Sequence, residues 1–256
     1  MMAVTPRIDF QPARFPSFSH KTIIIVGGFG SGKSEVSVNL ARDLSSQPGD
    51  PVAIADLDII NPYFRSREAA EALSKFGVTS LIPFGEHRYA DLPIIIPEIR
   101  TAIERRTSRL VLDVGGDDLG ARVLSSLADS FGTGGYELLL VHNARRPFTS
   151  DLNGSLRMIN EIESASRMKI TGLIANTHLA AESTAPISAE GVQLTQKVAD
   201  TLNMRVAFVS ALSELCPEID RILNQRYPIL PLDRELLKPW ETKPHPPTSM
   251  TRKRGG

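Results

Sequence analysis

The chain has 256 residues, a length within the range of one large α/β domain. Acidic and basic side chains balance at 29 each, so the overall charge gives no electrostatic case for nucleic acid or an anionic membrane as a partner. Hydrophobic residues make up 41% of the sequence, enough for a buried core, but the longest strongly apolar stretches, such as residues 92–96, are far too short to span a bilayer. Cys216 is the single cysteine, which excludes an internal disulfide and favours a reducing, cytoplasmic setting.

We expect the two ends of the chain to lie outside the folded domain. Residues 1–19 carry three prolines among polar residues and lack the continuous apolar core of a signal peptide, so they predict an extended arm. Residues 241–256 are rich in proline and basic side chains and predict a disordered basic tail. A solvated end explains this tail better than a nucleic-acid contact does. Residues 20–240 would then form the domain.

Apolar runs alternate with amphipathic helical patterns along this domain. The runs show no polar alternation, as expected of strands that are covered on both faces. Such an order predicts a mostly parallel central sheet with helices on both faces, a three-layer α/β/α domain. Strands are expected at 22–26, 52–56, 78–82, 109–113, 137–142, 170–176 and 205–210, and helices at 33–45, 64–76, 97–106, 119–130, 151–167, 188–203 and 217–225. Residues 228–239, with Trp240, are expected to pack against the domain as a C-terminal strap.

A glycine-rich stretch follows the first predicted strand and opens the first predicted helix. It fits the phosphate-loop pattern G-x-x-x-x-G-K-[ST] at each fixed position. The backbone N–H groups of such a loop, and the positive end of the helix behind it, face a polyphosphate. Lys33 would reach the β- and γ-phosphates, and the Ser34 hydroxyl would be a ligand of Mg²⁺. The predicted phosphate-binding residues are Gly27, Gly28, Phe29, Gly30, Ser31, Gly32, Lys33 and Ser34.

Two acids end the second predicted strand, and another acid ends the fourth. Asp56 and Asp58 stand at alternate positions, which puts them on the same side of the backbone. Neighbouring carboxylates repel unless a cation or a water network separates them, so we expect Mg²⁺ nearby, with a pair of solvent-facing loop acids as the alternative. Asp113 has the position of a Walker B acid that bonds the Mg²⁺ shell. Gly115 or Gly116 would let a backbone N–H approach the γ-phosphate.

With these motifs the chain resembles the SIMIBI class of P-loop NTPases, and more narrowly the CobQ/CobB/MinD/ParA nucleotide-binding family, over residues 22–235. The resemblance implies that the loop binds ATP and Mg²⁺ through Lys33 and Ser34. It also implies that Asp58 orients the attacking water, that Asp56 lies near Mg²⁺, and that Asp113 belongs to the Mg²⁺ shell.

The chain departs from that family at one position of the loop. MinD- and ParA-like members carry a signature lysine at the second loop position, where it crosses a dimer interface to the partner's nucleotide. Position 28 is glycine here, which argues against lysine-assisted hydrolysis and a nucleotide-sandwich dimer. A homodimer of another kind stays open. Nucleotide binding does not depend on the missing lysine, because it uses Lys33 and the backbone.

The choice of base rests on two segments. The resemblance implies that Asn176, at the end of the sixth predicted strand, contacts adenine; a turn-forming asparagine is the alternative. The Asn-Lys-x-Asp tetrad of guanine readers is absent, although Ser210 and Ala211 are similar to the short Ser-Ala loop of GTPases. We therefore expect ATP, with GTP as the alternative.

Some charged and polar residues near strand ends have competing interpretations. The arginines are candidates to supply positive charge to the γ-phosphate, or else simple surface cations; they are Arg65, Arg67, Arg145 and Arg146. His142 and His178 lack metal-ligand partners at usable spacing and are expected to be hydrogen-bonded histidines at strand ends.

These features predict a Mg²⁺-dependent ATPase that acts as a nucleotide switch on an unknown protein partner. Catalysis would rest on positioning and charge neutralisation by Lys33 and Asp58. One alternative is ATP-dependent phosphoryl transfer to, or ligation of, a small-molecule acceptor, for which the polar segment 84–91 is a candidate. Another is a switch that binds nucleotide without turnover.

Overall fold

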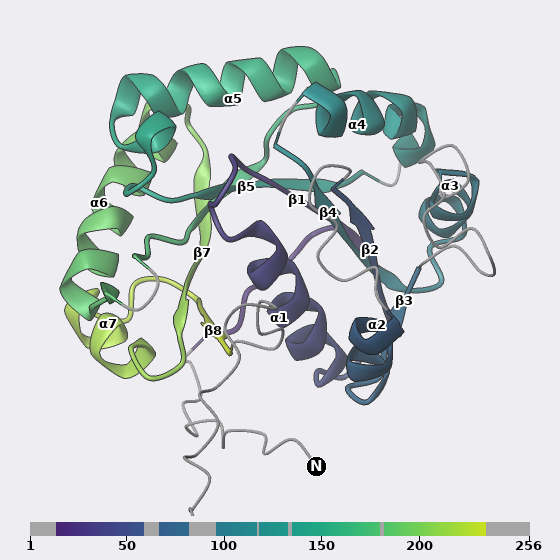
Figure 1. Cartoon of the computed structure of the whole chain (residues 1–256), viewed down its shortest axis with the longest axis horizontal. Helices are drawn as coiled ribbons and strands as arrows, with labels where there is room; N and C mark the ends of the chain where they lie inside the picture. Colours follow the sequence, from purple (N-terminus) through teal and green to yellow (C-terminus); the bar gives the residue numbers. More distant parts are fainter. Residues whose placement is uncertain are drawn as a thin grey trace, which may run out of the picture.

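The structure, a computed structural model, describes residues 14–58, 67–81, 96–116, 118–132, 135–179 and 182–233. Figure 1 shows a central sheet with helices on both sides. The strands are β1 (Thr22–Val26), β2 (Val52–Leu57), β3 (Val78–Ser80), β4 (Arg109–Val114), β5 (Glu137–His142), β6 (Gly172–Ala175), β7 (Arg205–Leu212) and β8 (Ile229–Leu232). The helices are α1 (Lys33–Ser45), α2 (Arg67–Ser74), α3 (Ile96–Arg105), α4 (Asp118–Phe131), the 3-10 turn η4 (Pro147–Thr149), α5 (Leu152–Ser166), α6 (Ala185–Thr201) and α7 (Cys216–Ile222).

Eight strands of the described chain form one sheet in the order β3-β2-β4-β1-β5-β6-β7-β8. Each pair of neighbouring strands is parallel, so the carboxyl ends of all the strands lie along one edge. β1 lies between β4 and β5, which places the loop after β1 at the middle of that edge. The predicted parallel sheet of a three-layer α/β/α domain is therefore confirmed.

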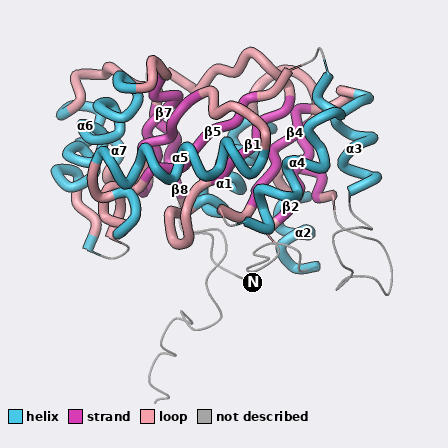
Figure 2. Tube along the Cα trace, turned by 90° about the horizontal axis from the view of Figure 1, so that it is seen from above, coloured by secondary structure: helices cyan, strands magenta, loops and turns pink. Residues whose placement is uncertain are grey.

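Alternate residues of the strands pack into two apolar layers, one on each face of the sheet. In β1, Ile24 and Val26 pack with residues of α3, α4 and α5, whereas Ile23 and Ile25 pack with residues of α1 and α2 on the other face. Figure 2 shows α3, α4 and α5 in succession across one face, with α6 and α7 at the β7–β8 end. Because the strands are covered on both sides, their sequences need no polar face.

Residues just before β1 cover part of the sheet that α1 leaves open. Phe15 and Phe18 pack against the α1 side of the core, and the rings of Phe18 and Phe208 meet edge to face with centroids 6.4 Å apart. The backbone N–H of Ser19 donates to Glu137 Oε1 at 2.9 Å. This end of the predicted arm therefore lies against the sheet.

The predicted helix at 33–45 has the same bounds in the structure, while α6 begins at Ala185, three residues before the predicted start at 188. The hydroxyl of Thr184 caps α6 by accepting from the backbone N–H of Ile187, and proline stands in its first turn. A threonine cap followed by proline is a start signal that the apolar periodicity alone did not reveal.

β8 lies within the segment that was expected to pack against the domain as a C-terminal strap, and it is a strand that the sequence analysis did not predict. Ile229–Leu232 forms a strand that pairs in parallel with β7 at the edge of the sheet. Pro231 obscured this strand, because proline is rare in strands and is accepted at an edge. Several predicted features lie outside the described residues: the arm at 1–13, Arg65, the segment 84–91, Trp240 and the tail at 241–256.

Within the described part of the chain, no helix has both the length and the apolar character needed to cross a bilayer.

Candidate functional site

Glycines shape the loop between β1 and α1. Gly30 and Gly32 have φ values of 71° and 93°, in the left-handed region where a side chain would strain the backbone. Gly32 is the N-cap of α1, and its carbonyl accepts from the N–H of Val36 at 3.0 Å. Since a glycine cap has no side chain to bond the amides of the first turn, these N–H groups and the positive helix end face the loop. The side chain of Phe29 is 85% exposed, so this residue can serve the loop only through its backbone.

Three charged side chains and one hydroxyl meet at the head of α1. Ser34 Oγ donates to Asp113 Oδ2 at 2.5 Å, and Lys33 Nζ lies 3.9 Å from Asp58 Oδ2. Lys33 and Asp58 are buried, and Asp113 is 0% exposed. Buried charges are retained only when they are paired or bonded, and here the ammonium lies beside a carboxylate that comes from another strand end. The structure therefore brings together four of the predicted site residues.

The oxygen donors in this cluster suit a hard cation. Asp56 and Asp113 are direct neighbours in the register of β2 and β4, and Asp56 Oδ1 accepts from the N–H of Asp58 at 3.0 Å. In the described residues no group of three or more His, Cys, Asp and Glu is arranged to hold a metal alone. Mg²⁺ does not need such a cage, because it keeps waters and binds through one or two protein oxygens plus phosphates. The Ser34 hydroxyl and the Asp113 carboxylate fit that requirement.

Burial dominates the titration of Asp113. Desolvation raises the pKa of this carboxyl to about 6, against the opposing influence of the Lys33 ammonium and of hydrogen bonds from Ser34 and Ser37. The nearby Asp58 charge also raises it. A carboxylate that is costly to ionise in the protein alone is stabilised by a divalent cation at the same place.

The turn after β4 touches the phosphate loop directly. A Cβ at Gly116 would lie 1.9 Å from the carbonyl oxygen of Gly27 and 2.5 Å from its carbon, so only glycine allows this approach. The turn after β4 and the phosphate loop are therefore in direct backbone contact. The approach of a backbone N–H at this turn to the γ-phosphate stays a prediction.

Asn176 is a brace of the same loop. Its Nδ2 donates to the carbonyl of Ser31 at 2.8 Å, and its Oδ1 accepts from Ser210 Oγ at 3.0 Å. A Cβ at Gly32 would lie only 2.4 Å from this amide nitrogen. The side chain is 1% exposed, yet an amide carries a second N–H that a base could still accept from. The adenine contact proposed for Asn176 stays a prediction.

Gly28, at the loop position where MinD- and ParA-like proteins carry the signature lysine, faces α5. A Cβ at Gly28 would lie 2.9 Å from the methyl carbon of Met158. A side chain at this position would therefore have to displace the end of the methionine. The packing of α5 against the loop accompanies the departure from the signature-lysine pattern.

Two consecutive arginines after β5 point to different partners. Arg146 Nε donates to the carbonyl of Gly30 in the phosphate loop at 2.7 Å. Arg145 pairs with Glu190 of α6, with Nη2 and Oε2 2.6 Å apart. Arg146 therefore stands beside the candidate phosphate site, and Arg145 does not share its contact. Arg65 and the side chain of Arg67 lie outside the described part of the structure.

His142 is hydrogen-bonded at the end of β5, as expected. Its Nδ1 lies 2.8 Å from Thr195 Oγ1 and its Nε2 lies 2.9 Å from Ser155 Oγ. Burial lowers the pKa of His142 to about 4, so the ring is neutral near pH 7. It ties β5 to α5 and α6.

Sequence reasoning missed one residue of this network and one of its hydrogen bonds. Ser37 Oγ donates to Asp113 Oδ1 at 3.2 Å, and its place three residues after Ser34 on the same helix was the available signal. The bond between Ser210 and Asn176 joins residues 34 positions apart, and no local pattern reports it.

Comparisons with known proteins give partial matches. No protein-family model matches the chain. Cytosolic Fe-S cluster assembly factor NUBP1 homologs from Caenorhabditis briggsae and Caenorhabditis elegans are each 49% identical over 49 residues. That match covers 19% of this chain and 16% of the length of each curated relative.

Solved structures also match in part. FtsY from Mycoplasma mycoides has a TM-score of 0.48 and 19% identity, with coverage of 86% of this chain and 70% of that chain. A Cyanothece McdA–ATP complex has a TM-score of 0.46 and 15% identity, with coverage of 82% and 90%.

The geometry of the chain itself carries the assignment of its class. The loop joins a central parallel strand to a helix, with the strand-end acids of β2 and β4 beside it. The lysine and the serine that end the motif lie within reach of those acids. The motifs that carry the resemblance to the SIMIBI class of P-loop NTPases therefore meet in space, as that resemblance requires.

Proposed function

We propose that this protein binds Mg-ATP at the loop Gly27–Ser34 and hydrolyses it, as a nucleotide switch that acts on a protein partner. The meeting of Lys33, Ser34, Asp58 and Asp113 at the head of α1 carries the proposal. A triphosphate needs an ammonium and backbone N–H groups, and its metal needs hard oxygen ligands. The site offers both within one cluster.

In the proposed complex each side chain has a separate task. Lys33 neutralises the β- and γ-phosphates, while Ser34 and Asp113 hold Mg²⁺ directly or through its water shell, with Asp56 alongside. Asp58, paired with Lys33 at 3.9 Å, orients the attacking water once the ammonium turns to the phosphates. Arg146, already bonded to the loop at Gly30, adds positive charge beside the γ-phosphate.

The proposed base is adenine, read at Asn176. The second N–H of its amide supports a base contact, since the first is donated to Ser31. Its bond to Ser210, in the segment similar to the Ser-Ala loop of GTPases, keeps GTP as the second candidate. A direct comparison of the two nucleotides decides between them.

The curated relatives support a proposal for the cellular location of this chain, but not for the binding of an Fe-S cluster. Their name describes cytosolic Fe-S cluster assembly, and we propose a cytoplasmic location for this chain as well. Protein-held clusters use cysteine thiolates, and this sequence has only Cys216, which is buried in α7. We therefore do not extend cluster binding to this chain.

The test compares nucleotide binding and phosphate release by the purified protein with ATP and GTP, each with and without Mg²⁺. We expect Lys33→Ala to lower nucleotide affinity by about tenfold or more, because it removes a charge-assisted contact. We expect Asp58→Asn to keep binding but to lower turnover by about 100-fold. Lys169→Ala is the matched control, because this lysine is exposed, pairs with Glu163 and is not one of the predicted site residues.

Three outcomes would change the proposal. Turnover of the Lys33→Ala variant at the rate of the unmodified protein would contradict it. Binding without turnover would support a non-hydrolysing switch. ADP release that depends on an added small-molecule acceptor would support phosphoryl transfer or ligation.

A further inference from the structure

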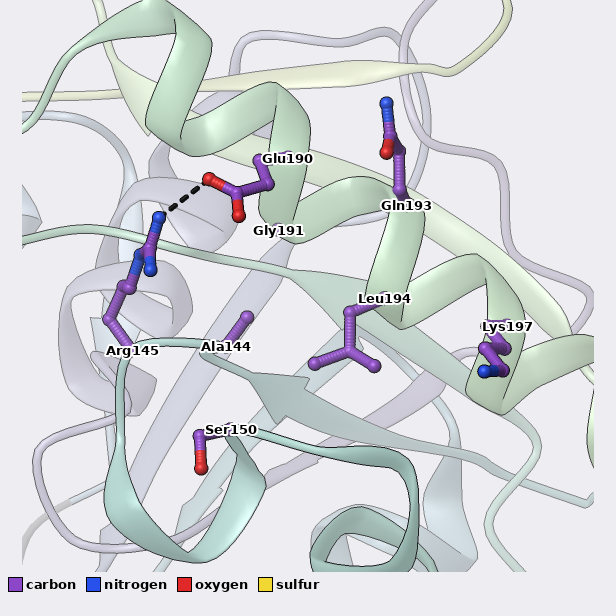
Figure 3. A pocket seen from close by; sticks show the side chains of 8 residues that line it. All are labelled: Ala144, Arg145, Ser150, Glu190, Gly191, Gln193, Leu194 and Lys197. Carbon is purple, nitrogen blue, oxygen red and sulfur yellow. Dashed lines mark hydrogen bonds and ion pairs between the residues drawn. The ribbon is translucent and has the colours of Figure 1, made fainter.

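A recess with a volume of about 300 Å³ lies between the loop after β5 and α6. Figure 3 shows Arg145 at one end, Lys197 at the other, and Leu194 between them. Ala144 and Ser150 line the side formed by the loop. The volume is at the small end of the range for ligand pockets, which indicates a compact ligand.

The charges of the lining favour an acid with two anionic ends. Arg145 and Lys197 are cationic, and Glu190 is the one acid among the lining residues. Glu190, Leu194 and Lys197 follow one another at helical spacing, so they share one face of α6, and Glu190 and Lys197 are about two turns apart. A ligand along this face meets cation, aliphatic carbon and cation in that order.

The ion pair across the recess can be exchanged at low cost. Arg145 Nη2 and Glu190 Oε2 are 2.6 Å apart, but the two side chains are 38% and 67% exposed. An exposed pair of this kind contributes little to stability, because solvent screens it. The guanidinium has five N–H donors in a planar fork that matches a carboxylate. A ligand carboxylate can therefore replace Glu190 at Arg145, or share it.

We propose that this recess binds a short aliphatic dicarboxylate, with one carboxylate at Arg145, the other at Lys197, and the carbon chain over Leu194. Ser150 lies beside the Arg145 end, and its hydroxyl donates to the carbonyl of Pro147 at 3.2 Å. The site is separate from the phosphate loop, which the neighbouring Arg146 contacts at Gly30. Binding here does not depend on the proposed nucleotide function.

The experiment titrates glutarate into the full-length protein by calorimetry, without nucleotide. We expect a dissociation constant of about 1 mM or tighter, and Arg145→Ala and Lys197→Ala should each weaken it by about tenfold. Butyrate, which keeps the saturated carbons of glutarate but lacks the second carboxylate, should bind about tenfold more weakly than glutarate. Glu190→Gln should strengthen glutarate binding, because it removes the acid that competes for Arg145.

Arg221→Ala is the matched control, because this arginine also pairs with an acid on an exposed helix face, 3.9 Å from Glu218, and does not line the recess. It should leave glutarate binding unchanged. Absence of binding to the unmodified protein would overturn the proposal. So would an equal loss with Arg221→Ala, which would indicate general screening, or equal affinity for butyrate. A protein that binds glutarate but not ATP would keep this inference and refute the proposed function.

Discussion

The two halves of the carboxyl edge of the sheet bury different kinds of polar side chain. The half formed by β1, β2 and β4, here called the charged half, buries Lys33, Asp56, Asp58 and Asp113. The half formed by β5, β6 and β7, here called the neutral half, buries uncharged polar side chains, namely His142, Asn143, Asn176, Thr177 and Ser210. The side chains of both halves are buried, so the main difference between the halves is charge.

The neutral half satisfies its polar groups internally. Asn143 Oδ1 accepts from the N–H of Arg145 at 2.9 Å, and Thr177 Oγ1 accepts from the N–H of Ala144 at 3.0 Å. Both the amide nitrogen and the amide oxygen of Asn176 are hydrogen-bonded. Satisfied networks of this kind hold a single arrangement.

The charged half instead places two aspartates side by side on neighbouring strands, which is costly unless a cation joins them. The neutral half provides a rigid frame, and the charged half is suited to ligand exchange.

The largest effect is expected where the charged half touches the loop. Gly116→Ala places a methyl group 1.9 Å from the backbone oxygen of Gly27, and backbone cannot yield as a side chain can. We expect a loss of about 3 kcal/mol or more of unfolding free energy, measured by urea denaturation. Gly28→Ala is the control, because its methyl meets the flexible end of Met158, and it should cost less than about 1 kcal/mol. Equal costs would show that the contact between turn and loop does not constrain the site.

The next effect tests the neutral half by pH. The pKa of His142 is about 4 in the fold against 6.5 for a free histidine, so below pH 6.5 the unfolded chain binds the proton first. The stability present above pH 6.5 is lost as the pH falls towards 4, and the difference amounts to about 3 kcal/mol. Denaturation curves of the protein and of His142→Gln across this interval measure it. The variant should lose less stability than the unmodified protein; an identical pH slope would contradict the assignment to His142.

The smallest effect has the opposite sign and belongs to the charged half. Burial raises the pKa of Asp113 from 3.8 to about 6, so above that pH the folded protein carries an ionised group that the unfolded chain solvates better. Asp113→Asn should therefore raise the unfolding free energy at neutral pH without nucleotide, by about 2 kcal/mol. The same variant should weaken the Mg²⁺ dependence of nucleotide binding. A less stable variant would show that the carboxylate is already compensated by Lys33, Ser34 and Ser37.

The sequence revealed the charged half more fully than the neutral half. The loop, Asp58 and Asp113 were predicted because each stands at the end of an apolar run in a fixed motif. The brace from Asn176 to Ser31 joins residues 145 positions apart, and the contact of Gly28 with Met158 depends on how α5 packs. Such contacts follow from tertiary packing, which local patterns do not encode. For the same reason β8 was missed, since its proline masks a strand that exists only through its pairing with β7.

That proline has a consequence for how the protein meets other chains. The carbonyl of Pro228 accepts from Val209 of β7, and that of Leu232 accepts from Ser213 just after β7. Because bonding alternates along a parallel strand, Pro231 faces away from β7, at the border of the described sheet. It presents no N–H there, and the next outward N–H, of Asp233, is donated to Asn39. At the opposite border, β3 spans just three residues. Both borders are thereby poor templates for strand addition, which protects a sheet rich in isoleucine, leucine and valine from self-association into fibrils.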